Sequence, residues 1–394
     1  MQKIQHYTLI ALFVICSACQ NRETNIKNKE LTYIHIDSLV NENLIIKNMH
    51  RHRFLPLETT QESLIAHIEK IEFDDDKIFI FDSNNRLFVF DENGRFLNTI
   101  GQIGQGPDEH RSMVGFYLDR KNKRVNIIDV FRMKIFSYSY EGVLKDRICI
   151  ARHQQIFDNS SRAYLLDNNT LLLEMGNSPQ SLYNFSLLSG RDFRRAEKNI
   201  PYLFVGSMSI RQRNRVAHNE NDTFLTAMIS DTIYRYDPKT RSIIPYMVFK
   251  GRYRPMTTRD IGRGELETGL DALRTARTRR LSFGIGQIMM TNRHLHFTFN
   301  THNGSFRVLW DMTTNRGYIS ERLLLSEPSV EAILNNYFGR LNAVTNNAFV
   351  SSILAYNFTY DVVRNLWKEY EPAREILETI LEDDNPVLIF YYID

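Results

Sequence analysis

The sequence predicts an all-β protein, a six-bladed β-propeller of four-stranded antiparallel blades. Three observations predict it: a strand-and-turn pattern that recurs about every 48 residues, strand-like apolar segments near both ends of the repeats, and a composition of 43% hydrophobic and 24% charged residues. Repeats of this length with several short strands are typical of propeller blades. The composition is that of a globular domain with ample apolar material for a core.

The first residues are expected to lie outside the fold. Residues 1–18 contain a basic residue, a short apolar run and a pair of small residues, which is the pattern of a signal peptide. The apolar run is too short to span a bilayer. Cysteine directly after the small pair resembles the lipobox of bacterial lipoproteins, so we expect lipid on Cys19 and a flexible tether over residues 19–30. A soluble secreted protein, cleaved nearby, is the alternative.

Cys149 is then the one cysteine left in the folded part, because Cys16 leaves with the signal peptide. A lone cysteine cannot form an intramolecular disulfide bond. Its neighbours in the segment Arg-Ile-Cys-Ile are mostly apolar, so we expect a buried structural thiol and no nucleophile.

Residues 31–394 are expected to form the propeller. The clearest repeat lies in residues 74–101, where two alternating apolar runs are joined by a polar turn and followed by a second turn. The same pattern returns in residues 123–148 at an offset of 48. Positions equivalent under this offset are Phe88 and Phe136, Phe90 and Tyr138, Gly94 and Gly142, and Phe96 and Leu144.

Three weaker copies follow in residues 183–193, 231–243 and 306–319. The turns of the five copies are predicted at Asp91, Ser139, Ser189, Asp237 and Asp311. The first four are spaced by 48, 50 and 48 residues, and the last follows after 74, so about 25 residues are inserted there. Five copies and a C-terminal segment make six blades.

Ring closure explains the apolar segments near the two ends. A propeller must cover its exposed strand edges, because an open edge pairs with other chains. Residues 52–60 and 385–393 both read as apolar strands. We therefore expect the N-terminal strand to complete the last blade beside the C-terminal strand.

Two insertions with helical periodicity break the strand pattern, at about 257–280 and 361–382, and residues 329–338 predict a third, short helix. Residues 252–280 hold eight arginines against four acids, and residues 361–385 hold eight acids against three basic residues. One interpretation of these opposite charges is a joint cap on one propeller face. The other is two separately solvated surfaces.

A glycine-rich stretch, IGQIGQGPDEH, follows the first repeat at residues 100–110. A phosphate-binding loop would lead into a helix and carry lysine with serine or threonine, whereas Asp108 and Glu109 follow here. We therefore expect no nucleotide and no other cofactor. The stretch instead permits positive φ and stiffens the chain where it crosses between blades, through Gly101, Gly104, Gly106 and Pro107.

The sequence resembles the NHL-repeat-like, or TolB-like, six-bladed β-propeller lipoproteins common in Bacteroidota. The matching segments are residues 54–60, 77–109 and 383–393. Family members show Gly-Pro-Gly-Glu after the glycine-rich stretch, and here the second glycine is Asp108. The resemblance implies a lipid-anchored protein of the cell envelope, at the outer membrane, and it brings no catalytic residues. It leaves open whether the protein faces the periplasm or the cell surface.

The usual ligand site of a propeller is the mouth of its central channel. Candidates just before the predicted inner strands are His110, Arg111, His153, Arg211, Arg213 and Arg215. Arginine side chains there would hold an anionic ligand such as an acidic sugar. The alternative is that these are solvated loop residues.

Motifs for metal binding or hydrolysis are absent from the sequence. His294 and His296 alternate on one side of a predicted strand, but no His-Glu-x-x-His motif, paired cysteines or Gly-x-Ser-x-Gly motif accompanies them. We therefore assign no metal ligand and no catalytic residue. A net charge of +3 with scattered lysine and arginine gives no argument for a nucleic-acid partner.

Three functions stay open. The first is a monomeric, non-catalytic module, anchored to the membrane by its lipid, that binds a glycan or another nutrient-related ligand. The second is a hydrolase or lyase acting on a carbohydrate or lactone at the central channel. The third is a subunit of an envelope assembly that docks through its helical insertions. The fold alone cannot decide among them, because one scaffold hosts many chemistries.

Overall fold

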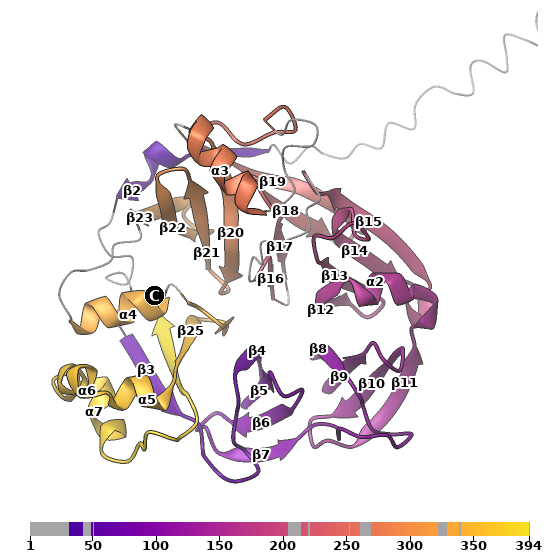
Figure 1. Cartoon of the computed structure of the whole chain (residues 1–394), viewed down its shortest axis with the longest axis vertical. Helices are drawn as coiled ribbons and strands as arrows, with labels where there is room; N and C mark the ends of the chain where they lie inside the picture. Colours follow the sequence, from indigo (N-terminus) through magenta and orange to yellow (C-terminus); the bar gives the residue numbers. More distant parts are fainter. Residues whose placement is uncertain are drawn as a thin grey trace, which may run out of the picture. The chain divides into compact units, whose positions relative to one another are not determined.

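Six antiparallel sheets surround a central axis, so the unit from Tyr33 to Asp394 is a six-bladed β-propeller, as Figure 1 shows. This confirms the predicted fold class. The computed structural model describes residues 31–41, 49, 51–203, 214–219, 221–251, 253–260, 269–321, 329–338 and 340–393.

Blades one to five each use four consecutive strands, which run from the centre of the ring to its rim (Figure 1). Blade one comprises β4 (Ile68–Asp74), β5 (Lys77–Asp82), β6 (Leu87–Asp91) and β7 (Phe96–Thr99). Blade two comprises β8 (Met113–Asp119), β9 (Arg124–Asp129), β10 (Lys134–Ser139) and β11 (Leu144–Cys149). Blade three comprises β12 (Ser160–Asp167), β13 (Thr170–Met175), β14 (Tyr183–Ser189) and β15 (Arg195–Pro201). Blade four comprises β16 (Val216–His218), β17 (Thr223–Thr226), β18 (Thr232–Asp237) and β19 (Ser242–Lys250). Blade five comprises β20 (Ser282–Met290), β21 (His294–Thr301), β22 (Gly304–Asp311) and β23 (Arg316–Glu321).

The five predicted repeat turns are confirmed, because each joins the third strand of a blade to the fourth. In blades one and two these turns close with Gly94 at φ +80° and Gly142 at φ +83°. Both angles lie in the left-handed region that glycine enters without steric cost.

Blade six closes the ring with strands from both ends of the chain. It comprises β24 (Ala343–Val344), β25 (Ala348–Ile353), β26 (Val387–Tyr392) and β3 (Arg51–Pro56). The pairing of β26 with β3 is antiparallel and places Leu388 opposite Leu55. The predicted closure is therefore confirmed.

Two short N-terminal strands, which the sequence analysis did not predict, cover the rim of the ring. β1 (Thr32–His35) joins the outer edge of blade four beside β19, and β2 (Val40–Asn41) pairs in parallel with β23 of blade five. A fifth strand on each blade satisfies backbone groups that an edge strand would leave unpaired.

Helices occupy the insertions that the sequence predicts. The described helices of four residues or more are α2 (Gln154–Asp158), α3 (Gly269–Arg279), α4 (Val330–Phe338), α5 (Ala355–Thr359), α6 (Asp361–Lys368) and α7 (Glu371–Leu377). Three 3₁₀ turns are η2 (Ile36–Ser38), η4 (Ala151–His153) and η5 (Arg191–Phe193). Pro372 lies in the first turn of α7, where proline does not disturb helical hydrogen bonds.

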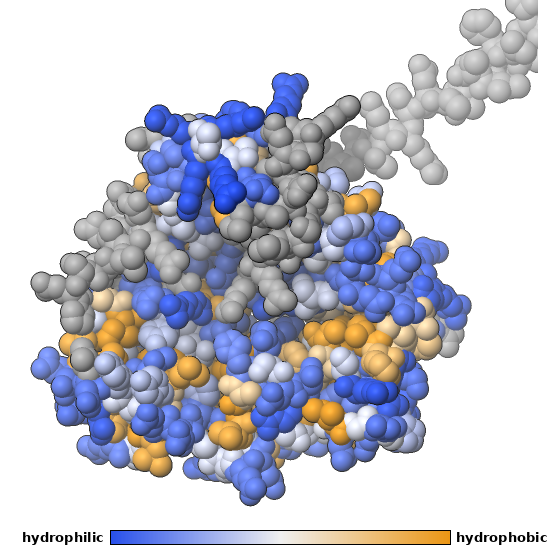
Figure 2. Space-filling model, viewed as in Figure 1, coloured by the Kyte–Doolittle hydropathy of each residue, from blue (hydrophilic) through white to orange (hydrophobic). Residues whose placement is uncertain are grey.

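The interpretation of a joint cap is wrong for the described residues. α3 packs through Ala272 and Ala276 into a cluster with Met228 and Phe283. α5, α6 and α7 belong to a separate cluster on blade six, centred on the fully buried Trp367. Figure 1 draws the two groups over different blades, and Figure 2 shows strongly hydrophilic side chains over α3.

Cys149 is exposed, so the expectation of a buried thiol is wrong. It ends β11, the outermost strand of blade two, where successive side chains point to opposite faces. Ile148 packs against the core, and the next side chain therefore points to solvent. The apolar neighbours Ile148 and Ile150 do not indicate this exposure. Ile148 points to the opposite face of the strand, and Ile150 lies beyond its end.

The glycines of residues 100–110 serve the backbone, but in two ways. Gly101 has φ +73°, as predicted, whereas Gly104 and Gly106 are not among the positive-φ glycines of the described residues. A Cβ atom at Gly104 would overlap the Glu109 carboxylate, which accepts a hydrogen bond from the Gly106 N–H at 2.7 Å. Gly104 and Gly106 leave room for this position of the Glu109 side chain. Pro107 lies in the turn between them and Glu109.

A substitution at Gly94 tests the contact between blade one and the closing strand β3. A Cβ atom there would lie 2.3 Å from the Pro56 carbonyl oxygen of β3, and φ is +80°. We expect Gly94→Ala to destabilise the protein by about 3 kcal/mol, because strain of the left-handed conformation adds to the overlap. Gly115→Ala is the matched control, since no atom lies within 4 Å of its Cβ position. Equal melting temperatures for the two variants would contradict the predicted contact.

Candidate functional site

A cavity of about 400 Å³ lies in the ring, lined by residues of the inner strands and of the segments beside them. Its lining includes residues from all six blades. The volume lies at the lower end of the range of about 300–1,000 Å³ typical of small-molecule sites. The cavity is therefore the candidate site of this protein.

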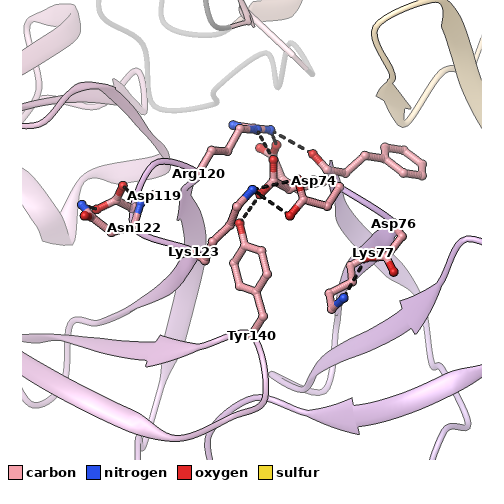
Figure 3. A network of polar contacts seen from close by, with 11 residues as sticks. Asp74, Asp76, Lys77, Asp119, Arg120, Asn122, Lys123 and Tyr140 are labelled. Atoms are coloured by element: carbon pink, nitrogen blue, oxygen red, sulfur yellow. Dashed lines mark hydrogen bonds and ion pairs between the residues drawn. The ribbon is translucent and has the colours of Figure 1, made fainter.

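Charged residues of blades one and two form one wall of the cavity, drawn in Figure 3. The Asp74 carboxylate accepts hydrogen bonds from the Tyr140 hydroxyl at 2.5 Å and from Lys123 Nζ at 3.0 Å. Arg120 lies 2.8 Å from Glu72 and 3.6 Å from Asp74. The set Lys70, Glu72, Asp74, Asp75, Arg120 and Lys123 is called the interblade network below.

Lys70 and Glu72 form an ion pair within the interblade network. Lys70 Nζ lies 3.0 Å from Glu72 and donates to the Phe116 carbonyl oxygen at 2.9 Å. Burial lowers the pKa of Lys70, which the Glu72 carboxylate partly offsets. Burial raises the pKa of Glu72 but the adjacent Lys70 and Arg120 cations outweigh it, and the pKa falls to about 2. Glu72 is therefore ionised at neutral pH.

Arg162 enters the cavity from β12 of blade three. Its guanidinium donates hydrogen bonds to the Asn214 side-chain oxygen and, at 3.4 Å, to the Glu69 carbonyl oxygen. Both partners are neutral. Arginine remains charged at any physiological pH, so a permanent cation faces the cavity here.

Polar groups without charge complete the lining. Six amide side chains contribute: Asn214, Asn219, Asn292, Asn342, Asn346 and Asn347. His218 also lines the cavity, with Nδ1 at 2.8 Å from the Thr223 hydroxyl, and burial lowers the pKa of its imidazole to about 4. These groups offer donors and acceptors that do not change with pH near neutrality.

Two of the predicted ligand residues, His110 and Arg111, lie at the opposite end of the inner strand of blade two from the cavity. His110 and Arg111 precede β8, whereas the cavity begins at Arg120, after the same strand ends. His110 is only 1% exposed, its ring Nε2 lies 3.3 Å from the Asn85 carbonyl oxygen, and burial lowers its pKa. The Arg111 guanidinium lies 4.0 Å from the centroid of the Phe131 ring.

His153 and Arg215 do not line the cavity either. His153 Nε2 lies 2.8 Å from the Phe193 carbonyl oxygen. Arg215 is buried and pairs with Glu174 at 2.9 Å, while its remaining nitrogens bond Asn184 and the Met175 carbonyl oxygen. This closed ion pair has a structural role between blades three and four. Arg211 and Arg213, like Cys19, lie outside the described residues.

His294 and His296 are buried core residues of blade five. The His296 ring packs edge-on against Phe338 and Phe349, and neither ring nitrogen has a hydrogen-bond partner in the described part of the chain. Among residues that the structure describes, no group of three or more His, Cys, Asp or Glu side chains is placed to hold a metal ion.

The sequence of β4 carries a signal for the cavity. Lys70, Glu72 and Asp74 stand at alternate positions of this inner strand, so their side chains lie on the same side of it. The acidic turn that follows this strand extends the same wall. Arg162 carried a weaker signal, because a single arginine in a strand is common at sheet edges.

The family model described as "Domain of unknown function (DUF4934)" matches residues 38–392. The chain belongs to this family. It is similar in structure to a protein from Bacteroides fragilis described as a "Putative exported protein", at 19% identity with a TM-score of 0.70, covering 92% of this chain and 100% of that one. A member of the DUF4221 family from Bacteroides vulgatus matches at 11% identity with a TM-score of 0.51, covering 88% and 97%. No curated protein matches.

The two structural similarities lie below 25% identity and support the propeller fold alone. Within the described residues, no helix is both long enough and apolar enough to cross a membrane.

Because His296 is buried, we predict that the protein loses stability in acid. Burial, and secondly the Arg307 cation, lower its pKa to about 3, whereas an unfolded histidine titrates near 6.5. The unfolded state therefore binds the extra proton as pH falls from 6.5 towards 3. We expect this residue to cost about 2 kcal/mol of stability between pH 7 and pH 5. In denaturant melts at both pH values, His296→Phe should lose correspondingly less, and the exposed His67→Gln control should behave as wild type. An acid loss unchanged in His296→Phe would contradict the assignment.

Proposed function

We propose that this protein is a non-catalytic binding protein for a small saccharide, which it holds in the channel cavity. The observation that carries the proposal is the lining: amide, charged and aromatic side chains from six blades converge on about 400 Å³. Small-molecule sites are mostly apolar, so a lining this rich in donors and acceptors favours a ligand with many hydroxyl groups.

Two aromatic rings also line the cavity. Phe390 and Tyr392 stack on each other with centroids 6.3 Å apart and planes 18° apart. The Arg53 and Arg51 guanidinium groups lie over these rings, and Phe390 is buried, so the rings support the wall of the cavity and the polar groups carry the proposal.

We infer that the protein acts at the cell envelope, anchored by lipid on Cys19 at the outer membrane. The signal-peptide pattern of residues 1–18 supports export. The Bacteroides fragilis protein, described as exported, points the same way. The NHL-like resemblance supports the lipid anchor.

Asn292 provides the test, because its side chain is exposed at the cavity and has one weak partner, Asn219 at 3.5 Å. The experiment screens the chain that follows Cys19 on a glycan array, and calorimetry then measures affinity for the strongest small saccharide. We expect Asn292→Ala to weaken binding about threefold to tenfold through loss of a hydrogen bond.

Asn84→Ala is the matched control, since Asn84 is exposed in the β5–β6 turn and does not line the cavity. Its affinity should equal that of wild type. Product formation from the bound saccharide would favour the hydrolase or lyase alternative. Failure of every saccharide to bind, or equal losses in both variants, would contradict the proposal.

A further inference from the structure

We propose that Arg162 forms an anion subsite in the cavity and that the saccharide bound there carries a carboxylate, as a uronic acid does. This inference rests on the proposed saccharide function and deepens it. Three observations carry it: the direct partners of Arg162, the neighbouring cations Lys70 and Arg120, and the free donors of its guanidinium.

Arg162 is a cation whose hydrogen-bond partners are all neutral. It donates to the Asn214 side-chain oxygen and the Glu69 carbonyl oxygen. Among the ion pairs of the described residues, none places a carboxylate oxygen within 4.0 Å of its guanidinium. The described ion pairs of the other cavity cations are Lys70–Glu72, Arg120–Glu72, Arg120–Asp74 and Lys77–Asp76. Arg53 is the exception, and it lies over the Phe390 ring while donating to the Glu92 carbonyl oxygen.

The carboxylates nearest to Arg162 pair directly with other cations. Glu72 pairs with Lys70 and Arg120, and Glu174, on the neighbouring strand β13, pairs with Arg215 at 2.9 Å. Burial acts to lower the pKa of Arg162, but Tyr164, Glu174 and Glu72 outweigh it and raise this pKa, so both carboxylates act on the guanidinium without touching it. The five cations and five carboxylates that line the cavity balance, and Arg162 itself is left without a carboxylate in direct contact among the described residues.

Like charges lie close together at this point. The Arg162 and Arg120 cations, after burial itself, are causes that lower the pKa of Lys70. An unpaired cation in a half-buried position is unfavourable, because the protein interior screens it less than water does. An anion bound between Arg162 and Lys70 would relieve this repulsion.

The geometry of the guanidinium suits a carboxylate. Its planar array of N–H donors has more members than the two hydrogen bonds to Asn214 and Glu69 use. Arginine binds carboxylates through paired, charge-assisted hydrogen bonds, which are stronger than bonds between neutral groups. The amides of the cavity would meet the hydroxyl groups of the same sugar.

The test compares three probes by calorimetry on the chain that follows Cys19, at low ionic strength: sodium glucuronate, glucose and sodium sulfate. We expect wild type to bind glucuronate more tightly than glucose, with an affinity that weakens as salt rises. Arg162→Gln keeps a hydrogen-bonding side chain of similar reach but removes the charge. It should weaken glucuronate binding about 10- to 100-fold and glucose binding less than about threefold.

Arg152→Gln is the matched control, because Arg152 is exposed in η4 before β12 and does not line the cavity. It should leave both affinities unchanged. Arg162→Lys retains the charge without the paired donors and should fall between wild type and Arg162→Gln. Because Arg162→Lys keeps the cation, it also provides a test of the anion subsite if Arg162→Gln does not fold.

The outcomes separate the two proposals. Glucose binding that equals glucuronate binding, or glucuronate affinity unchanged in Arg162→Gln, overturns the anion subsite and leaves the saccharide function standing. Sulfate binding that depends on Arg162 without any sugar binding supports the anion subsite and overturns the saccharide function. No binding of any probe overturns the carboxylated sugar, and the glycan array then decides the saccharide function.

Discussion

The antiparallel pairing of β26 with β3 is the interaction on which the rest of the structure depends. It joins strands from opposite ends of the chain and turns a row of six sheets into a closed ring. The two faces of β26 also connect separate parts of the core: Leu388 packs with blade one, while Ile389 packs with the helices of the last insertion. An open row of blades could not enclose a cavity that draws its lining from all six.

Ring geometry also explains why charged groups can occupy the centre. Inner strands approach each other around the axis, so a lysine or glutamate that points inward can meet partners from the next blade as well as from its own. The interblade network satisfies this condition, with Tyr140 and Lys123 of blade two bonded to Asp74 of blade one. Removing one member would leave a half-buried charge unpaired, which is costly. Arg162 departs from the pattern, because its hydrogen bonds go to neutral groups, and that departure is the basis of the proposed anion subsite.

Much of the fold could be predicted because its signals are local. The turns at Asp91 and Ser139 carry glycine three residues later, where the backbone needs positive φ, and the closing strand is apolar on both faces.

The site could not be predicted in the same way. His110 lies in a loop that reads as a ligand-binding loop, yet packing between blades buries it. Which end of the channel holds a cavity depends on side chains from six blades at once, and no spacing along the chain encodes this. Cys149 was misjudged because composition does not tell which face of an edge strand a residue takes.

A crystal structure of the chain that follows Cys19, soaked with glucuronate, tests the central claim that the closed ring presents a charged, polar cavity to an acidic sugar. The account predicts a sugar among the cavity asparagines, with its carboxylate within hydrogen-bond distance of the Arg162 guanidinium. A sugar bound at the other end of the channel near His110 and His153, or on the outer surface of the blades, would contradict it.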